Sequence, residues 1–336
     1  MPKSAVSITA LARDLKISAM SVSVALRGKP GVSEALRAKI LKRARELGYR
    51  PNPVAAELMS LVRSRSRSRG TETIAFLNTF ADADLFFRIP GLGDFVTGAR
   101  ARAQEYGYGV EVFHARKEGV TGKRLAGILR ARGVRGILVG PRWRTEPDID
   151  FSWDDFSVVL VGEAEYGPNL YRVCNHHVHS CFTVLQALAA KGYGRIGLAL
   201  VREDESKRGY DYLLGVEQFR LSGGRAEVVS WLYQEFSSKE FVAWTKRERL
   251  DAVVSLAVDP GLESAKLKGP EGKAMGYANL NVVAGMHWAG IDQNSLEIGG
   301  AAVDLLRGLL LEGERGVVPR PRIVLVEGKW VDAVTG

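Results

Sequence analysis

Cysteine is scarce in this 336-residue sequence, which contains two, Cys174 and Cys181. A chain of this length can build a core without a disulfide, and two thiols suit a reducing compartment. Long apolar runs are also missing, because segments such as Val158–Val161 are much shorter than the roughly 20 residues that span a bilayer. The first residues, MPKSAVSITALARDL, carry charges where a signal peptide needs an uninterrupted apolar stretch. These absences argue against a secreted or membrane-spanning protein and predict a cytoplasmic one.

The rest of the composition is that of an ordinary globular protein, with 46% hydrophobic and 25% charged residues. Its positive charge, however, is unevenly placed. Residues 1–70 hold 15 lysines and arginines but only 4 acidic residues, whereas the remainder holds 32 basic and 34 acidic residues. A small basic segment before a near-neutral body is typical of a nucleic-acid binder. A basic tail kept for solubility is the alternative.

Helical periodicity is clear within the basic segment. Ile8, Leu11, Ala12 and Leu15 recur at helical spacing, and a second short helix is predicted from about Ala19 to Arg27. Two short helices joined by a three-residue turn indicate a helix-turn-helix. The second helix should direct Val22, Ala25 and Leu26 inward and leave Ala19, Met20, Ser21, Ser23 and Val24 on its outer side.

A third helix is predicted from Glu34 to Leu47, with Ser33 as its cap and Gly48 after its end. The next residues predict a short fourth helix from Pro53 to about Leu61, with proline at the first helical position. The alternating serines and arginines of Arg63–Arg69 have no apolar face and indicate a linker. Its arginines either follow DNA phosphates or are simply solvated.

From Thr73 onwards, short apolar runs alternate with amphipathic helices. Strands are predicted at Ile74–Leu77, Val110–Phe113, Gly136–Val139, Ser157–Val161, Ile196–Val201, Glu227–Trp231, Ala252–Leu256 and Ile323–Val326. Helices are predicted at Gly98–Tyr106, Lys123–Arg132, Phe182–Lys191, Tyr210–Leu221, Phe241–Arg249 and Leu296–Leu311. This alternation predicts an α/β body with parallel sheets flanked by helices. Two such sheets would form two lobes, with a ligand cleft at the carboxyl ends of their strands.

The residues from about Val6 to Leu61, above all V-S-E-A-L-R…E-L-G-Y-R-P-N, resemble the head of LacI/GalR-type bacterial transcription regulators. The resemblance continues through I-A-F-L-N-T-F, R-G-I-L-V-G, L-A-A-K-G-Y-G-R-I-G-L-A and the C-terminal A-G-I-D-Q-N…R-I-V-L-V-E-G-K-W. It implies a helix-turn-helix head at residues 1–50, a hinge helix and basic linker at 51–72, and a two-lobed periplasmic-binding-protein-like domain at 73–336. It also implies a homodimer on a palindromic operator in double-stranded DNA, with a small-molecule effector in each cleft. No cofactor is expected.

In that family the second helix enters the major groove and a hinge leucine, here Leu58, wedges into the minor groove. The physical logic is general, because an apolar wedge opens a base step and bends the duplex. The expected DNA-binding residues are Thr9, Ser18, Ala19, Met20, Ser21, Ser23, Val24, Arg27, Asn52, Val54, Ala55 and Leu58. Val24 stands where many members have arginine, so contact with thymine methyl groups or reading by Arg27 is expected instead. Ordinary core packing of Met20 and Val24 is the alternative.

The cleft departs further from the family pattern. Tyr212 stands where an arginine often anchors the effector, and Arg208, about one turn earlier, is a possible substitute. Val258-Asp259 replaces the usual Asn-Asp, and the following segment carries too many glycines and prolines for the usual helix. The expected effector-binding residues are Asn78, Phe80, Phe87, Trp143, His176, Tyr212, Asp259, Asn279 and Gln293. The altered cleft argues against a sugar or purine effector and leaves a regulator with a vestigial cleft as a rival.

Other chemistry finds little support in the sequence. The stretch C-N-H-H-V-H-S-C, Cys174 to Cys181, has metal-ligand residue types, but it is interpreted as polar cleft or surface histidines at the start of a helix. Gly91–Gly98 has glycines misplaced for a dinucleotide loop. No metal site and no enzyme is therefore expected. A solute-binding protein on the same fold is a further rival, against which the basic head and the absent signal peptide argue.

Overall fold

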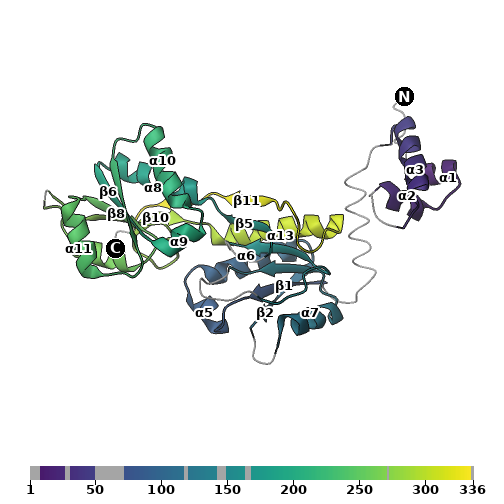
Figure 1. Ribbon diagram of the computed structural model, residues 1–336, viewed down its shortest axis with the longest axis horizontal. Coiled ribbons are helices and arrows are strands. Elements are labelled where there is room, and N and C mark those ends of the chain that lie inside the picture. Colours follow the sequence, from purple (N-terminus) through teal and green to yellow (C-terminus); the bar gives the residue numbers. More distant parts are fainter. Residues whose placement is uncertain are drawn as a thin grey trace. The chain divides into compact units, whose positions relative to one another are not determined.

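The computed structural model describes residues 8–26, 31–49, 72–116, 120–141, 149–162, 168–270 and 272–333. Its contacts divide the chain into two compact units, Met1–Arg69 and Gly70–Gly336, here called the head and the body. The predicted helix at Pro53–Leu61 and the Arg63–Arg69 linker lie outside the described residues. Each unit is considered by itself below (Figure 1).

Three helices form the described part of the head: α1 (Ile8–Leu15), α2 (Ala19–Leu26) and α3 (Glu34–Glu46). They pack around a small apolar core, whose buried residues are Leu11, Ala12, Val22, Ala25, Ile40 and Ala44. The inward positions predicted for α2 are confirmed at Val22 and Ala25, and Leu26 packs against the same core. The sequence periodicity therefore predicted the packing of the head correctly.

Local hydrogen bonds fix the ends of these helices. Lys16 has a left-handed φ of 55° in the turn between α1 and α2. The backbone N–H of Ser21 then donates to the Ser18 hydroxyl at 3.0 Å, and the N–H of Leu36 donates to the Ser33 hydroxyl at 3.3 Å. Such caps satisfy donors that the first helical turn leaves open. The turn between α1 and α2 is thus set by the sequence immediately around it.

One ion pair joins the first and third helices of the head. Nε and Nη2 of Arg43 donate to the two carboxylate oxygens of Asp14 at 2.6 and 3.0 Å. This bidentate pair holds the pKa of Asp14 below its ordinary value, chiefly through the hydrogen bond from Arg43. Arg43 also bonds Glu46 within α3. The pair gives geometric definition to a head with a small core.

The first lobe of the body is a parallel sheet in the order β11-β5-β4-β3-β1-β2. Its strands are β1 (Glu72–Asn78), β2 (Tyr108–His114), β3 (Gly136–Val139), β4 (Ser157–Val161), β5 (Tyr171–Asn175) and β11 (Ile323–Val326). Its helices are α5 (Ala83–Arg88), α6 (Leu92–Glu105), α7 (Gly122–Ala131) and α13 (Ser295–Glu312). Ile74 and Phe76 of β1 pack with residues of α6 and α13 on one face, whereas Ala75 and Leu77 pack with α7 on the other.

The second lobe has the sheet order β12-β10-β9-β8-β6-β7. Its strands are β6 (Arg195–Val201), β7 (Glu227–Tyr233), β8 (Ala252–Ser255), β9 (Gly276–Asn279), β10 (Ala289–Asp292) and β12 (Lys329–Val331). Its helices are α8 (His177–Ala190), α9 (Arg202–Lys207), α10 (Asp211–Leu221), α11 (Ser238–Arg247) and α12 (Asp259–Ser264). Apolar residues of α8 and α10 pack on one face, and Phe241 and Trp244 of α11 pack on the other.

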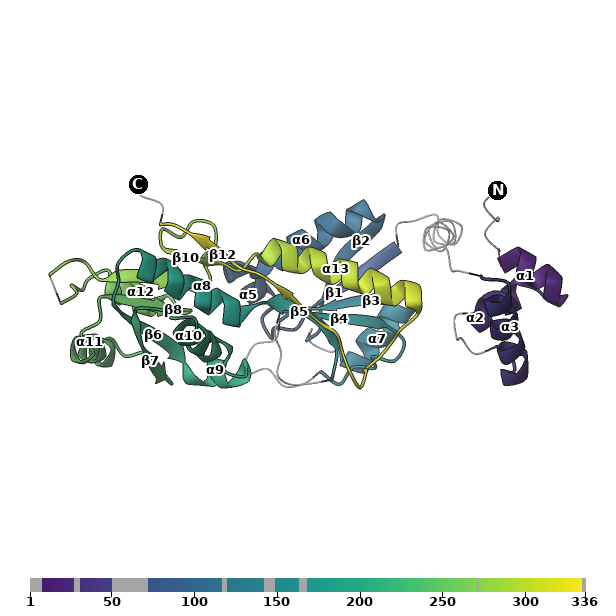
Figure 2. The same ribbon diagram turned by 90° about the horizontal axis from the view of Figure 1, so that it is seen from above.

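The chain passes between the lobes three times. It leaves the first lobe after β5, returns between β10 and α13, and leaves again between β11 and β12. The late elements α13 and β11 therefore complete a lobe that begins at β1. Figure 2 shows α13 lying along α6, a pair separated by about 200 residues of sequence.

The predicted α/β class and two-sheet organisation are confirmed, but several details differ. Strands β5, β9 and β10 were not predicted, and α6 begins at Leu92 rather than at Gly98. The second sheet is not wholly parallel, because β12 pairs antiparallel with β10. The helix predicted to begin at Phe182 begins at His177. The glycine- and proline-rich segment after Asp259 does form a helix, the six-residue α12, because Pro260 lies in its first turn, where a missing N–H costs nothing. No helix among the described residues is long and apolar enough to cross a membrane.

Candidate functional site

The outer face of α2 carries the residues predicted to read DNA. Ala19 is exposed, and Met20 is 71% exposed, so Met20 takes no part in the head core. Ser21, Ser23 and Val24 are half-buried. Met20 thus lies exposed on the second helix of a helix-turn-helix, and in such motifs this helix faces the bases of the major groove.

The remaining predicted DNA-binding residues lie outside the outer face of α2 or outside the described residues. Ser18 is exposed, and its hydroxyl is engaged in capping α2 and lies 2.9 Å from the Ser21 hydroxyl. Thr9 lies in α1. Arg27, Asn52, Val54, Ala55 and Leu58 lie outside the described residues. Beyond these, α1, α3 and the turn after α1 carry exposed basic residues of a kind that contacts phosphates in protein–DNA complexes, namely Arg13, Lys16, Lys39, Lys42 and Arg45.

A cavity of about 610 Å³ lies between the two lobes of the body. Its lining comes from the residues that follow the carboxyl ends of strands, including Phe80 after β1, Pro141 after β3, Gly162 after β4 and Asn281 after β9. This is the position that parallel α/β sheets give to their ligands. The volume is that of a small-molecule site.

Three of the predicted effector residues line this cavity, namely Phe80, Tyr212 and Gln293. They are tied to one another or to their lobe. Nε2 of Gln293 donates to the Tyr212 hydroxyl at 3.1 Å and to the Leu280 carbonyl at 2.8 Å. The same hydroxyl lies 2.9 Å from Nδ1 of His177. Tyr212 is thus held by His177 of α8 and by Gln293 of the connection between β10 and α13.

The other predicted effector residues that the structure describes do not line the cavity. Asn78 is buried and donates to the Ala83 carbonyl at 2.9 Å, whereas Phe87 is 51% exposed. Asn279 is buried and donates to the Tyr277 hydroxyl at 2.9 Å. His176 directly precedes the lining residue His177, and Asp259 directly follows the lining residue Val258. Trp143 lies outside the described residues.

Sequence reasoning missed the acidic part of the wall. Asp204 and Glu205 of α9 line the cavity with Arg208, and Glu205 is fully buried. The signal was present in R-E-D-E-S-K, but a run of charges ordinarily indicates a solvated helix face. Carboxylates also lie near Tyr233, where burial first and then the charges of Asp259 and Asp204 raise the pKa of the phenol to about 12.

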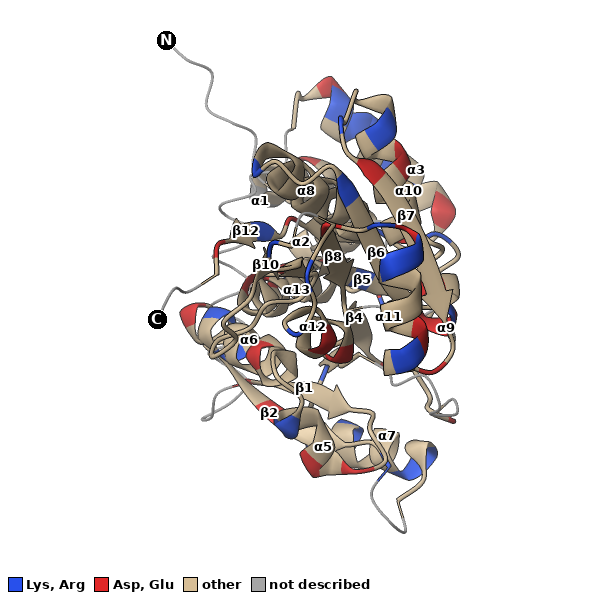
Figure 3. Ribbon diagram, turned by 90° about the vertical axis from the view of Figure 1, so that its left-hand side faces the viewer, with Lys and Arg blue, Asp and Glu red and all other residues tan. Residues whose placement is uncertain are grey.

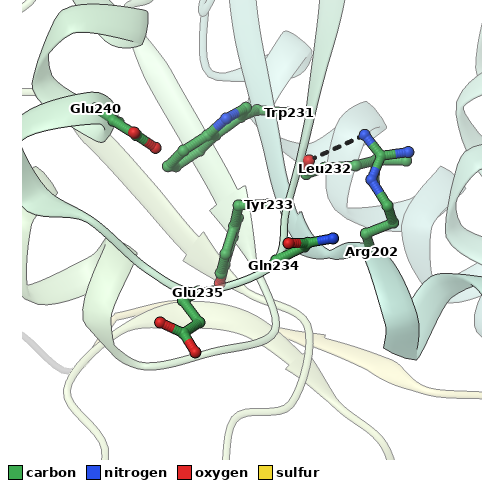
Figure 4. A pocket seen from close by; sticks show the side chains of 7 residues that line it. All are labelled: Arg202, Trp231, Leu232, Tyr233, Gln234, Glu235 and Glu240. Carbon is green, nitrogen blue, oxygen red and sulfur yellow. Dashed lines mark hydrogen bonds between the residues drawn. The ribbon is translucent and has the colours of Figure 1, made fainter.

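A second hollow, of about 500 Å³, lies at the end of β7 (Figure 4). The indole of Trp231 and the carboxylate of Glu240 face it on one side, and Arg202 lies on the other. The guanidinium of Arg202 donates to the Leu232 carbonyl at 3.3 Å. Arg202 is therefore held at this hollow, and the described residues of α9 that line the cavity between the lobes are Asp204 and Glu205.

The Cys174–Cys181 segment runs from the end of β5 into α8. Neither cysteine forms a disulfide, both are buried, and burial raises the pKa of Cys181. The rings of His176 and His179 are stacked at 5.6 Å. Among the residues that the structure describes, no three His, Cys, Asp or Glu side chains are grouped to hold a metal ion.

One side chain joins all three connections between the lobes. Nδ2 of Asn175 donates to the Gln293 carbonyl at 3.3 Å and to the Val326 carbonyl at 3.2 Å. Its Oδ1 accepts from the Ser180 hydroxyl at 2.8 Å. The backbone N–H of His176 also donates to the Val326 carbonyl at 2.8 Å. Asn175 is thus the polar centre of the hinge.

We expect Asn175→Ala to destabilise the body by about 2 kcal/mol, because the buried Ser180 hydroxyl and the Gln293 carbonyl lose the partner that Asn175 provides. The measurement is the urea midpoint of the body, followed by near-ultraviolet circular dichroism. Asn169→Ala is the control, since Asn169 is exposed, and it should cost less than about 0.5 kcal/mol. Equal midpoints for the two variants would remove the role assigned to Asn175.

Comparisons with known proteins agree with this architecture. Residues 7–52 match the model of the family described as bacterial regulatory proteins, lacI family. An HTH-type transcriptional regulator of Mycobacterium tuberculosis is 30% identical over 41% of this chain, a match that spans only 36% of that relative. The NTD biosynthesis operon regulator NtdR of Bacillus subtilis is 26% identical over 70% of this chain and 67% of its own length.

Solved structures share the fold at low sequence identity. A structure of a transcriptional regulator CelR–cellobiose complex aligns over 98% of this chain and 99% of the CelR chain, with a TM-score of 0.55 and 21% sequence identity. The Lac repressor bound to ONPG aligns over 98% of this chain and 99% of the repressor chain, with a TM-score of 0.53 and 16% sequence identity. These relatives and neighbours are regulators, not enzymes. The chain thus has a head that matches the lacI family and a body of the two-lobed periplasmic-binding-protein-like fold, and it is similar to LacI/GalR-type DNA-binding transcription regulators.

Proposed function

We propose that this protein is a cytoplasmic, homodimeric repressor that binds a palindromic operator. A small molecule bound in the inter-lobe cavity would raise or lower its affinity for that operator. The observation that carries the proposal is the pairing of an exposed α2 face on a basic head with a cavity at the strand ends of the body. A module that reads DNA and a module that binds a ligand are what such regulation requires.

The head supplies the reading chemistry. We propose that the exposed Ala19 and Met20 contact thymine methyl groups and that exposed lysines and arginines of the head contact phosphates. A symmetric dimer would present two such heads to half-sites about one helical turn apart. Because Met20 and Val24 cannot donate to guanine, the preferred half-site should differ from that of relatives with arginine there.

The body supplies the control. A ligand that binds one arrangement of the lobes better than another shifts the population between them. The three connections between the lobes converge on Asn175, so a change in lobe closure is focused on this hinge. The proposed output is a change in the order of the hinge helix between head and body.

The test of this function is an unbiased selection of DNA fragments by the purified full-length protein at near-physiological salt. An enriched palindrome with two half-sites would support a symmetric dimer. Binding that falls with salt but enriches no sequence, with and without added metabolite extract, would contradict a specific regulator. Removal of residues 1–70 should abolish binding while the body stays folded.

The hinge leucine gives a sharper test. Leu58 lies outside the described residues, and its wedge role is a prediction from the sequence. We expect Leu58→Ala to weaken operator binding about tenfold or more, because the apolar wedge recovers unstacking energy only on a bent specific site. Binding to random DNA should change less than about twofold.

Fluorescence anisotropy with operator and scrambled duplexes measures both affinities. Met59→Ala, the next residue, is the matched control because it removes a similar apolar side chain. Equal losses on operator and scrambled DNA would reject the wedge.

A further inference from the structure

Apolar side chains from both lobes line the inter-lobe cavity. Those that keep part of their surface accessible are Ile89, Leu92, Pro141, Val201, Leu256, Ala257 and Val258. The first three belong to the first lobe and the other four to the second. Phe80 lines the cavity as well, and its ring is held edge-on against Phe86, with ring centroids 5.5 Å apart. A ligand in this cavity therefore meets apolar surface from both lobes.

Two of the strands that end at the cavity bring no charge to it. β4 and β8 contain no charged residue, and both are tan in Figure 3. Gly162 directly follows β4 and Leu256 directly follows β8, and both residues line the cavity. These strand ends thus present backbone and an apolar side chain to a ligand.

The charged side chains of the lining are already used within the protein. Asp204, Glu205 and Arg208 each take part in an interaction with another residue. Glu205 is fully buried, and its Oε2 accepts from the Leu213 N–H at 3.4 Å. Among the described lining residues, the accessible charges are therefore one carboxylate and one guanidinium, Asp204 and Arg208, which offset each other. A charged ligand would lose its hydration here without finding an uncompensated partner.

The neutral polar side chains of the lining are mostly engaged as well. Tyr212, His177 and Gln293 form the chain of hydrogen bonds described above, and Asn175 is bonded to two backbone carbonyls. A sugar needs many donors and acceptors to replace the water around its hydroxyl groups, and these side chains would have to give up existing bonds to supply them. The remaining half-buried polar side chain of the described lining is Asn281. Its amide can serve one polar group of a ligand.

We propose that the inter-lobe cavity binds an uncharged, largely apolar ring compound, with its rings between the apolar side chains of the two lobes and a single polar group at Asn281. The inference rests on the proposed function, since it names the ligand class of the same cleft. Removal of the rings and of the lining side chains from water drives the binding. The polar group fixes the orientation of the ligand, and a cavity of about 610 Å³ accommodates two fused rings.

Four probes test the ligand class on the full-length protein: 2-naphthalenemethanol, 2-naphthalenemethylamine, 2-naphthoate and cellobiose. The first three share two fused rings and differ in the charge of the substituent, whereas the two rings of cellobiose are covered with hydroxyl groups. Isothermal titration calorimetry at several temperatures gives the affinity and the heat-capacity change of binding. We expect the alcohol to bind about tenfold or more tightly than the other three, with a negative heat-capacity change.

Val258→Asn replaces part of the apolar wall with an amide at a position that is 43% exposed. It should weaken binding of the alcohol about fivefold, because the rings lose an apolar contact. Val317→Asn is the matched control, since Val317 is 47% exposed and does not line the cavity, and it should leave the affinity unchanged. Equal effects of the two variants would show that the probe binds elsewhere on the protein, and would overturn the proposal.

The role of Asn281 has its own test. Asn281→Ala should weaken the alcohol about threefold or more, because its hydroxyl loses a hydrogen-bond partner. Binding of 2-methylnaphthalene, which has the same rings and no hydroxyl, should not change. Equal losses for the two compounds would remove the contact assigned to Asn281.

The other outcomes are equally decisive. Tighter binding of the amine, the acid or cellobiose, or no binding of any probe, overturns the proposed ligand class. The selection of DNA fragments is run on the same preparations. If the protein selects a palindrome and binds none of the probes, only the ligand class fails. If it binds the alcohol but selects no DNA, the proposed function fails and the ligand class stands.

Discussion

Replacement of Val22 by aspartate should abolish DNA binding while the body remains folded. Val22 is fully buried in the head, where it shares a core with Leu11 and Ile40. A carboxylate placed there either stays ionised without a partner or becomes protonated at a cost, and both lose several kcal/mol. A core of six buried residues has little stability to spare.

The expected result is therefore an unfolded head and a loss of affinity of at least about 100-fold for operator and random DNA alike. Anisotropy titration measures the affinity, and the melting transition of the body should be unchanged, because head and body are separate units. Ala38→Asp is the control, since it adds the same charge at an exposed position of α3. Wild-type DNA binding by the Val22→Asp protein would place the DNA-binding element elsewhere in the chain.

Gly299→Ala should destabilise the body strongly, whereas Gly308→Ala, in the same helix, should not. A Cβ on Gly299 would lie 2.1 Å from the Phe95 carbonyl oxygen and 2.9 Å from the Ala99 nitrogen, both backbone atoms of α6. The same close approach is seen from α6, because a Cβ on Gly98 would lie 1.8 Å from the Leu296 carbonyl oxygen of α13. The two helices pack with their backbones nearly touching, so neither can give way locally.

We expect Gly299→Ala to cost about 3 kcal/mol or more, a value typical of overpacking that displaces backbone. No atom lies within 4 Å of a Cβ on Gly308, so alanine there should instead stabilise α13 by up to about 1 kcal/mol. Urea unfolding of both variants measures the difference. A similar stability for both would mean that α6 and α13 separate easily, which their packing does not allow.

The sequence predicted the fold well because hydrophobic periodicity is a local signal. The strands at 136–139, 157–161 and 323–326 were predicted to the residue, and so were the inward-facing Val22 and Ala25. Antiparallel β12 was missed, since three residues at an edge carry no periodicity. Apolar periodicity alone predicted the start of α8 at Phe182, whereas the interpretation of the Cys174–Cys181 segment as the start of a helix agrees with the observed start at His177.

The site was predicted less completely, because a cavity is made by residues that are distant in sequence. The resemblance to a known family predicted three lining residues, Phe80, Tyr212 and Gln293. Glu205 was not, since burial of an acidic residue in a charged helix depends on how α9 packs beside α10. The role of Asn175 depends on carbonyls 118 and 151 residues away in sequence, which no local pattern indicates.

The three passages between the lobes have a consequence during synthesis. Strand β1 leaves the ribosome early, but the helix that packs on α6 and the edge strand that pairs with β5 lie at Ser295–Glu312 and Ile323–Val326. By then strands β6 to β10 of the second lobe have all been made. The nascent chain must therefore carry an open apolar face on its first sheet while the second lobe assembles, so the lobe that is begun first is finished last.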